Sequence, residues 1–364
     1  MDINAAVTNS AGSEFSIETV QIDDPREFEI LVRVKATGIC HTDISAKNQY
    51  IPFPLPGVLG HEGAGIVEKI GSAVTKVMPG DHVTLSWLSC GVCDACRSGN
   101  NVYCQDFLKL NFGGVRNDGT TTLRRDGKPL HGSFFGQSSF ASHALVTEDN
   151  IVKVTDSVPI EIMGPLGCGV MTGAGAVMNS LKPSPGSSIA IFGSGTVGMS
   201  AIMAAKVCGC TTIIAVDVKE NRLKTAMDLG ATHVVNAKEV DPVKTILEMT
   251  KGGPNFSLEC VGNPSIFRQA IDILPLMGVC GLVGVVAPGT EVKLDMNLIM
   301  NGRTIKGIIE GDAVPDLFIP KLIELNRQGR FPYDKLIKYY PFEQINQAVE
   351  DMEKGLVIKP VLTQ

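Results

Sequence analysis

Residues 188–198, SIAIFGSGTVG, decide the fold of the second half of the chain. The first five residues are an apolar run typical of a buried strand, and the turn that follows opens a helix at Thr196. In a G-x-G-x-x-G turn of this kind, Gly193 permits the tight turn, Gly195 lets the backbone approach a pyrophosphate, and Gly198 lets the helix pack closely on the strand. The helix N-terminus adds free amides and a positive dipole. A Gly-rich turn without a ligand is the alternative, but the strand–turn–helix order favours dinucleotide binding.

A carboxylate at the end of the next predicted strand indicates which dinucleotide binds. Asp217 lies 19 residues after Gly198, where an acidic side chain bonds the adenosine ribose hydroxyls and repels a 2′-phosphate. The sequence therefore favours NAD over NADP. Arg222, one helical turn further on, is either a second ribose contact or a solvated helix charge. Lys219 and Arg222 together leave NADP as an open alternative.

From about Pro185 the sequence alternates between strands and helices, as in a doubly wound parallel sheet. The predicted strands are Ser188–Phe192, Thr212–Val216, His233–Asn236, Phe256–Cys260, Val279–Val285 and Thr304–Ile309. The predicted helices are Thr196–Cys208, Asn221–Leu229 and one that begins at Asp241-Pro242, an N-cap followed by a first-turn proline. Six strands in this order predict a dinucleotide-binding domain over residues 170–312.

The first part of the chain, residues 1–169, is predicted to be β-rich. Short apolar runs separated by Gly and Pro indicate strands such as Glu29–Ala36, Gly65–Ile70 and His82–Ser86. Asn111–Ser139 is polar and Gly-rich, which predicts a long surface loop or lobe. Residues 313–364, with predicted helices Ile319–Gln328 and Glu343–Lys354, are expected to return to the first domain.

Composition excludes several classes of protein. A chain of 364 residues with 44% hydrophobic residues is expected to form about two domains with a sizeable core. The net charge of −6 and the absence of a Lys/Arg block argue against nucleic acid as the main partner. No signal-peptide pattern and no run of about 18 apolar residues is present, so we expect a cytoplasmic protein without membrane spans.

Four cysteines follow the spacing Cys90-x2-Cys93-x2-Cys96-x7-Cys104. Thiolates at this spacing converge on one point and suit tetrahedral Zn²⁺. Disulfide pairing is the alternative, but it is rare in reducing compartments. A four-sulfur site has no open position, so we expect a structural zinc without catalytic chemistry.

Three further motifs lie outside this run: Cys40-His41-Thr42-Asp43, Gly60-His61-Glu62-Gly63 and Gly167-Cys168-Gly169. Each is weak alone, because a lone cysteine is more often a small buried hydrophobe. Together with Gly80-Asp81-His82-Val83, the cysteine run and the Gly-rich turn, they resemble the zinc-dependent medium-chain alcohol dehydrogenases over essentially the whole chain. The resemblance implies an α/β enzyme with a GroES-like β-rich catalytic domain and a Rossmann doubly wound parallel sheet.

The resemblance also implies a second, catalytic zinc, giving two per chain. Cys40, His61 and Cys168 are the implied ligands, and this Cys₂His set leaves one position open. Glu62 lies beside the site. Asp43 is expected to orient His61 by accepting its other N–H, with an exposed loop carboxylate as the alternative.

The implied proton relay begins at Thr42, whose hydroxyl would bond the substrate oxygen. The best-known members place a histidine three residues later, where this chain has Ser45. The relay is therefore expected to end at His41 or at water.

The resemblance implies four further contacts with the cofactor, one of them from within the Gly-rich turn. His41 and Lys359 match pyrophosphate contacts, and Thr172 and Val197 match positions that hold the nicotinamide ring.

The substrate class is suggested by three phrases similar to the aryl (benzyl) alcohol dehydrogenase branch: residues 37–43, TGICHTD; residues 135–140, FGQSSF; and residues 164–169, GPLGCG. The single tryptophan, Trp87, either lines the substrate site, where a flat ring suits an aromatic or allylic alcohol, or packs in the core. We expect reversible oxidation of primary aromatic or allylic alcohols to aldehydes, with hydride transfer to NAD⁺.

Several alternatives remain at this stage. A polyol dehydrogenase is the nearest, although many such relatives replace the Cys168 ligand with Glu. A formaldehyde–glutathione dehydrogenase needs a site for an anionic peptide adduct, which the sequence does not locate. A non-enzymatic NAD-binding protein predicts damaged zinc ligands, and all seven are present. The resemblance further implies a homodimer or homotetramer that associates through the last strand of the cofactor sheet, near Thr304–Glu310.

Overall fold

The computed structural model describes residues 1–364, which divide into two compact units. The first unit contains residues 1–168, 314–323 and 334–364, and the second contains residues 169–313 and 324–333. One segment differs from the sequence prediction. Residues 324–333, expected to return to the first domain, belong to the second unit and include the fully buried rings of Phe331 and Tyr333.

The second unit contains one six-stranded parallel sheet in the order β13-β12-β11-β14-β15-β16. Its strands are β11 Ser188–Phe192, β12 Thr212–Asp217, β13 His233–Asn236, β14 Phe256–Glu259, β15 Val279–Leu282 and β16 Thr304–Gly307. The predicted doubly wound sheet is therefore confirmed. The strand predicted as Val279–Val285 is shorter, because the amides of Val283 and Gly284 bond the carbonyl of Glu259 beyond the ladder.

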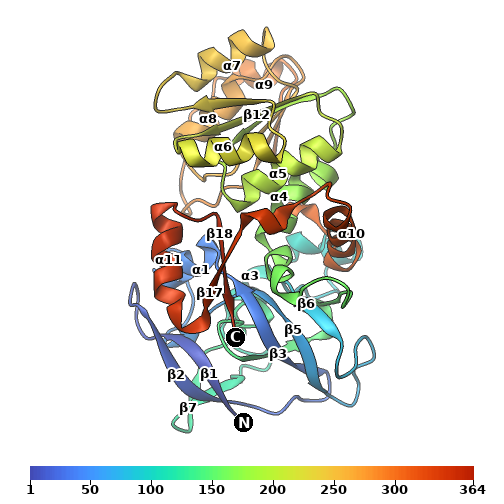
Figure 1. The fold of residues 1–364 in the computed structure, drawn as a ribbon, viewed down its shortest axis with the longest axis vertical. Helices are drawn as coiled ribbons and strands as arrows, with labels where there is room; N and C mark the ends of the chain where they lie inside the picture. Colours follow the sequence, from blue (N-terminus) through green and yellow to red (C-terminus); the bar gives the residue numbers. More distant parts are fainter. The chain divides into compact units, whose positions relative to one another are not determined.

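Helices α4–α9 connect the strands of this sheet or precede them (Figure 1). They are α4 Gly169–Gly175, continued as a π-helix over Ala176–Leu181, α5 Thr196–Val207, α6 Glu220–Leu229, α7 Pro242–Thr250, α8 Pro264–Asp272 and α9 Met296–Met300. Asp241 caps α7 by accepting from the amides of Val243 and Lys244. Asn263 caps α8 in the same way, although the sequence analysis did not predict that helix.

The first unit contains two sheets. The smaller sheet has the order β4-β1-β2-β7-β8, and the larger has the order β10-β6-β5-β3-β18-β17, with β9 also paired to β3. The strands are β1 Asp2–Thr8, β2 Phe15–Ile22, β3 Glu29–Gly38, β4 Gly57–Val58, β5 Glu62–Ile70, β6 His82–Leu85, β7 Leu123–Arg125, β8 Lys128–Leu130, β9 His143–Thr147, β10 Ile151–Lys153, β17 Ile337–Pro341 and β18 Lys359–Thr363. The long strand β3 is central, since it pairs with β5, β9 and β18.

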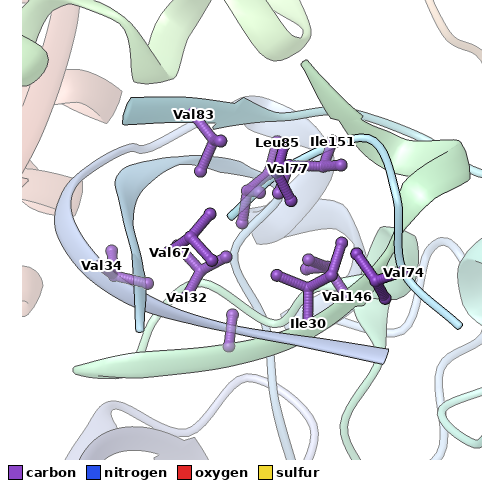
Figure 2. Close-up of a cluster of buried hydrophobic side chains, with 11 residues drawn as sticks. Ile30, Val32, Val34, Val67, Val74, Val77, Val83, Leu85, Val146 and Ile151 are labelled. Atoms are coloured by element: carbon purple, nitrogen blue, oxygen red, sulfur yellow. The ribbon is translucent and has the colours of Figure 1, made fainter. Parts of the chain in front are cut away.

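The core of the larger sheet is formed by β-branched side chains. Figure 2 shows Ile30 and Val32 of β3 packed with Val67 of β5 and Val83 of β6. Valine and isoleucine are stiff at χ1 and pack well on a pleated surface. Strands β3 and β5 of this core continue to the pair Gly38–Glu62, beside which the site residues lie.

The remaining helices of the first unit are α1 His41–Lys47, α2 Asp94–Arg97, α3 Phe107–Phe112, α11 Ile345–Lys354 and the first part of α10 Pro315–Arg327. No single helix of the chain is both long enough and apolar enough to cross a bilayer.

The prediction that residues 111–139 form a surface loop is wrong in part. The segment contains the β7–β8 hairpin, and its last residues, including Phe134, Gln137 and Ser139, are buried. Its polar residues do not face solvent throughout, because several of them bond buried backbone groups. Gln137, for example, donates to the carbonyls of His61 and Ser86.

Candidate active site

Four side chains from separate parts of the first unit converge on one point. Cys40 is the N-cap of α1, His61 and Glu62 stand at the start of β5, and Cys168 follows the turn Gly164–Gly167. One ligand atom from each of these four residues lies within 4.8 Å of the other three. Sulfur, imidazole nitrogen and carboxylate oxygen are the ligand atoms that Zn²⁺ prefers.

Asp43 holds two of these groups in place. Its Oδ1 lies 2.7 Å from His61 Nδ1 and accepts from the amide of Gly60 at 3.2 Å. Its Oδ2 accepts from the amide of Cys40 at 2.9 Å. Asp43 is fully buried, so the exposed-loop alternative does not hold. Because the Asp43 contact uses Nδ1, Nε2 is the nitrogen of His61 that faces the cluster.

The cluster fits a bound cation. His61 Nε2 is buried and has no hydrogen-bond partner, which is unusual for a buried polar atom. The pKa of the Cys40 thiol lies well below its ordinary value, through its hydrogen bond with Cys168 and the neighbouring His61 and Lys359. Burial opposes a charge on His61, but Asp43 and Cys40 raise its pKa. Metal binding at such a site uses the neutral imidazole and the thiolate forms of these side chains.

Glu62 is paired with a cation from the far end of the chain. Lys359 Nζ donates to Glu62 Oε2 at 2.7 Å, to Glu62 Oε1 at 2.9 Å and to the carbonyl of Ile39 at 3.0 Å. Both side chains are buried, which raises the pKa of Glu62, while the Glu62 charge raises that of Lys359 despite burial. In this structure the Lys359 ammonium is used inside the first unit, and its predicted contact with a pyrophosphate stays a prediction.

An aromatic layer covers the imidazole. The ring of Phe135 stacks on His61 with centroids 4.6 Å apart, and Phe134 meets it edge-on at 5.6 Å. Phe135 begins the segment 135–140, which resembles the aryl alcohol dehydrogenase branch, but no role for its ring was predicted. Trp87, the predicted substrate contact, is 3% exposed and lies 5.9 Å from Phe107, which in turn contacts Phe135.

The turn that presents these rings has an unusual backbone. Ser133, Phe135 and Ser138 all have φ between 51° and 56°, a left-handed conformation that costs on the order of 1–3 kcal/mol for each residue other than glycine. The turn is held by side-chain hydrogen bonds. Asn150 donates to the carbonyl of Phe135, and Ser138 Oγ donates to the carbonyl of Val58 at 2.6 Å.

The four-cysteine run forms a second cluster. The sulfur atoms of Cys90, Cys93, Cys96 and Cys104 lie within 4.8 Å of one another, and none of them is in a disulfide. Amide hydrogen bonds point at the sulfurs, from Cys90 to Cys104 Sγ at 3.2 Å and from Cys93 to Cys90 Sγ at 3.4 Å. The amides of Gln105 and Cys96 lower the pKa of Cys93 to about 6. Four sulfurs with amide donors are typical of a closed zinc site.

The Gly-rich turn of the second unit has the geometry that a pyrophosphate needs. Gly193 has φ of +92°, and a Cβ there would lie 2.6 Å from Val261 Cγ2. A Cβ at Gly198 would lie 1.8 Å from the carbonyl oxygen of Gly193, so only glycine allows this helix–turn contact. A Cβ at Gly195 would meet nothing within 4 Å, which leaves open space above the backbone at the start of α5.

Asp217 ends β12 and already contacts the Gly-rich turn. Its Oδ2 accepts from the amide of Ser194 at 2.7 Å, and its Oδ1 accepts from the amides of Val218 and Lys219. The carboxylate therefore ties the turn to the strand end, besides its predicted contact with a ribose. Arg222 lies in the first turns of α6, with a buried Nε that has no hydrogen-bond partner.

The other predicted residues are distributed over both units. In the first unit, Thr42 lies in the first turn of α1 with Oγ1 3.7 Å from Cys40 Sγ, and His41 is exposed. In the second unit, Val197 is in the first turn of α5, and Thr172 of α4 donates to Glu310 Oε2 at 3.1 Å. Their predicted contacts with a cofactor stay predictions.

Two family descriptions match the chain. Residues 26–156 match the alcohol dehydrogenase GroES-like domain, and residues 196–325 match the zinc-binding dehydrogenase domain. A geraniol dehydrogenase of Castellaniella defragrans is 44% identical over 98% of this chain and 96% of its own length.

Solved structures agree in fold over the whole chain. A zinc-binding-domain alcohol dehydrogenase protein from Burkholderia ambifaria is 53% identical, with a TM-score of 0.98 over 100% of this chain and 99% of its own. A benzyl alcohol dehydrogenase from Acinetobacter calcoaceticus is 49% identical, with a TM-score of 0.97 and the same coverage.

Two separate ligand sets predict two zinc ions per chain and different effects of removing each. Cys93→Ser should lose one zinc and lower the melting temperature, because a structural site contributes folding free energy. Cys40→Ser should lose activity while the fold and the other zinc persist. Zinc content by mass spectrometry and thermal unfolding measure both, with Cys208→Ser, outside both clusters, as the control. One zinc per chain in fully active protein would contradict the two-site assignment.

Proposed function

The chain belongs to the zinc-dependent medium-chain alcohol dehydrogenases, and from this premise we propose that it oxidises primary aromatic or allylic alcohols to aldehydes, reversibly, with NAD as the hydride acceptor. The observation on which the proposal rests is the buried cluster of Cys40, His61, Glu62 and Cys168, in which the Nε2 of His61 has no protein partner. Relatives described as geraniol and benzyl alcohol dehydrogenases support the substrate class.

Cys40, His61 and Cys168 are the proposed ligands of the catalytic zinc. When bound, zinc supplies Lewis-acid chemistry that favours the deprotonated form of an alcohol hydroxyl near neutral pH. Lys359 holds Glu62 by both carboxylate oxygens, which leaves the three-ligand set with a position for substrate. Cys90, Cys93, Cys96 and Cys104 are the proposed structural zinc ligands.

The Thr42 hydroxyl is the proposed first proton acceptor. It lies beside the Cys40 sulfur, in the first turn of a helix whose start is fixed by Asp43. Ser45, one turn further along α1, lacks a titratable ring, so the proton then passes to His41 or to solvent. His41 is exposed and so is able to exchange a proton with water.

The aromatic layer supports a substrate with a π system. Phe135, Phe134, Phe107 and Trp87 form a continuous set of ring contacts that begins at His61. Aromatic rings prefer edge-to-face or offset contacts with other π systems, at about 0.5–1.5 kcal/mol each beyond simple burial. In a substrate bound against this layer, such contacts would favour a benzyl or allyl group over an ethyl group.

NAD, with adenosine ribose at Asp217, is the proposed cofactor. Gly193, Gly195, Thr196 and Gly198 are placed to hold the pyrophosphate at the start of α5. Bound there, NAD supplies the hydride acceptor. Asp217 provides a carboxylate where a 2′-phosphate would bring further negative charge.

A homo-oligomer is the proposed assembly. Strand β16 ends the sheet and has one unpaired edge, and its residues are mostly exposed. Large apolar side chains are exposed on the adjacent turn and on α9, among them Met277, Met296 and Met300. Pairing of β16 with its copy in a second chain would cover this edge.

The substrate proposal predicts a clear order of efficiency. Steady-state NAD⁺ reduction should give the highest kcat/KM with benzyl, cinnamyl or geranyl alcohol and lower values with cyclohexanol and ethanol. Sorbitol tests for polyol dehydrogenase activity, and S-hydroxymethylglutathione tests for formaldehyde–glutathione dehydrogenase activity. If either of these two is the best substrate, the aromatic or allylic assignment is wrong.

Asp217 should determine cofactor preference. Wild-type protein should prefer NAD⁺ strongly, and Asp217→Asn, which keeps an acceptor for the Ser194 amide but removes the charge, should narrow that preference. Asp217→Gly should narrow it further and also weaken binding of both cofactors, because it releases the Gly-rich turn. The ratio of kcat/KM for NAD⁺ to that for NADP⁺ measures the effect. Equal efficiency in the wild type would refute the role given to Asp217.

The relay predicts different outcomes for two substitutions of one residue. Thr42→Ser keeps a hydroxyl and should retain much of the activity. Thr42→Val keeps the shape without a proton carrier, so kcat should fall by about 10²–10⁴-fold. Ser45→Ala is the matched control on the same helix and should leave the pH–rate profile unchanged if the proton leaves by His41 or solvent. A fully active Thr42→Val protein would remove this residue from the mechanism.

A further inference from the structure

The order of the parallel strands defines where a dinucleotide lies in the second unit. The strands are all parallel, but the order in which they are added reverses at β11. Strands β12 and β13 lie on one side of it, and β14, β15 and β16 lie on the other. Ligands of such sheets bind outside the carboxyl ends of the strands at this reversal. The Gly-rich turn and Asp217 occupy the ends of β11 and β12, so they hold the adenosine half. The other half of the dinucleotide then lies over the ends of β14 and β15.

A buried carboxylate stands at the end of β14. Glu259 is 0% exposed, and its Oε1 accepts from the amides of Val261 and Gly262 at 2.8 Å each. Its Oε2 is buried as well and lies against Gly284, where a Cβ would meet it at 2.5 Å. Burial raises the pKa of Glu259, against the lowering effect of hydrogen bonds from backbone amides of the turns after β14 and β15.

Glu259 joins the turn after β14 to the turn after β15. Its side chain holds residues 261–263, and its carbonyl accepts from the amides of Val283 and Gly284 at 2.9 and 3.1 Å. The two turns are in direct backbone contact. A Cβ at Gly284 would lie 2.0 Å from the amide nitrogen of Gly262, and a Cβ at Gly262 would lie 2.3 Å from the carbonyl oxygen of Val285.

The same turns also touch the Gly-rich turn. The Val261 side chain lies where a Cβ at Gly193 would meet it at 2.6 Å. A change in the conformation of residues 261–263 therefore moves the Val261 side chain that packs against Gly193. Neither Glu259 nor its amide partners contact Asp217, whose hydrogen bonds go to Ser194, Val218 and Lys219.

We propose that Glu259 is a positioning residue for the nicotinamide half of the cofactor. It fixes the two turns at the ends of β14 and β15, while Asp217, which shares no hydrogen-bond partner with Glu259, binds the adenosine half. This inference rests on the proposed NAD function.

The proposal predicts that substitution of Glu259 changes the affinities for two ligands by different amounts, although both contain the adenosine and pyrophosphate groups. ADP-ribose lacks nicotinamide, and NADH has it. Glu259→Ala leaves the amides of Val261 and Gly262 without their acceptor, so the dissociation constant for NADH should rise about tenfold or more. The constant for ADP-ribose should stay within about twofold of the wild type. Glu259→Gln keeps one acceptor oxygen without the charge, so its NADH affinity should lie between those of wild type and Glu259→Ala.

Calorimetric titration of the zinc-loaded protein with each ligand measures both constants directly. Ser257→Ala is the matched control, because Ser257 is equally buried on the same strand. Its hydroxyl donates to the carbonyl of Ala270 and not to residues 261–263. It should alter thermal stability and leave both affinities unchanged. If Glu259→Ala does not fold, the comparison of Glu259→Gln with wild type decides the question.

Three outcomes would overturn the proposal. The first is an unchanged NADH affinity in the folded Glu259 variants. The second is an equal loss of NADH and ADP-ribose affinity, which would make Glu259 a general support of the sheet. The third is wild-type protein that binds neither ligand, which identifies the failure of the dinucleotide function itself rather than of Glu259.

Discussion

The two oxygens of the Asp43 carboxylate join parts of the chain that come from different strands and turns. One oxygen bonds the His61 ring and the amide of Gly60, and the other bonds the amide of Cys40 at the start of α1. The positions of the His61 ring and of Cys40, two of the proposed zinc ligands, thus depend on a single fully buried group. Geometry at a metal site needs support of this kind, since the ligands alone do not determine their own orientation. The remaining contacts of the site add to an arrangement that Asp43 has already defined.

The aromatic rings around His61 strengthen these polar contacts. Phe134 and Phe135 exclude water from the imidazole, and hydrogen bonds and ion pairs are stronger where the local dielectric constant is low. Phe135, whose ring stacks on His61, has a left-handed backbone conformation that costs free energy. Hydrogen bonds from Asn150 and Ser138 hold the turn, and they account for the polar character of this part of the sequence.

Local signals in the sequence predicted most of the fold. Contacts between residues far apart in the chain were not predictable from it. The Gly-rich turn, the Asp241-Pro242 helix start and the six apolar strands depend on neighbouring residues, and the structure agrees with them. Helix α8 has the same signal in Asn263-Pro264, which the sequence analysis overlooked. The burial of residues 134–139 was not predictable from composition, because polar side chains that bond buried backbone groups have the same composition as an exposed loop. The partner of Lys359 was not predictable either, because nothing local shows that Glu62, 297 residues earlier, lies beside it.

That separation has a consequence for how the protein is made. On the ribosome, Glu62 emerges long before Lys359, and β18 must insert between β3 and β17 to bring the ammonium to it. Until then the Glu62 carboxylate has no counter-charge in the interior, and burying it alone is strongly unfavourable. The second unit, residues 169–313 and 324–333, lies between these two partners along the chain, so the pair joins an early and a late part of the first unit. The ion pair beside the ligand cluster therefore forms only after β18 has been made and has paired with β3.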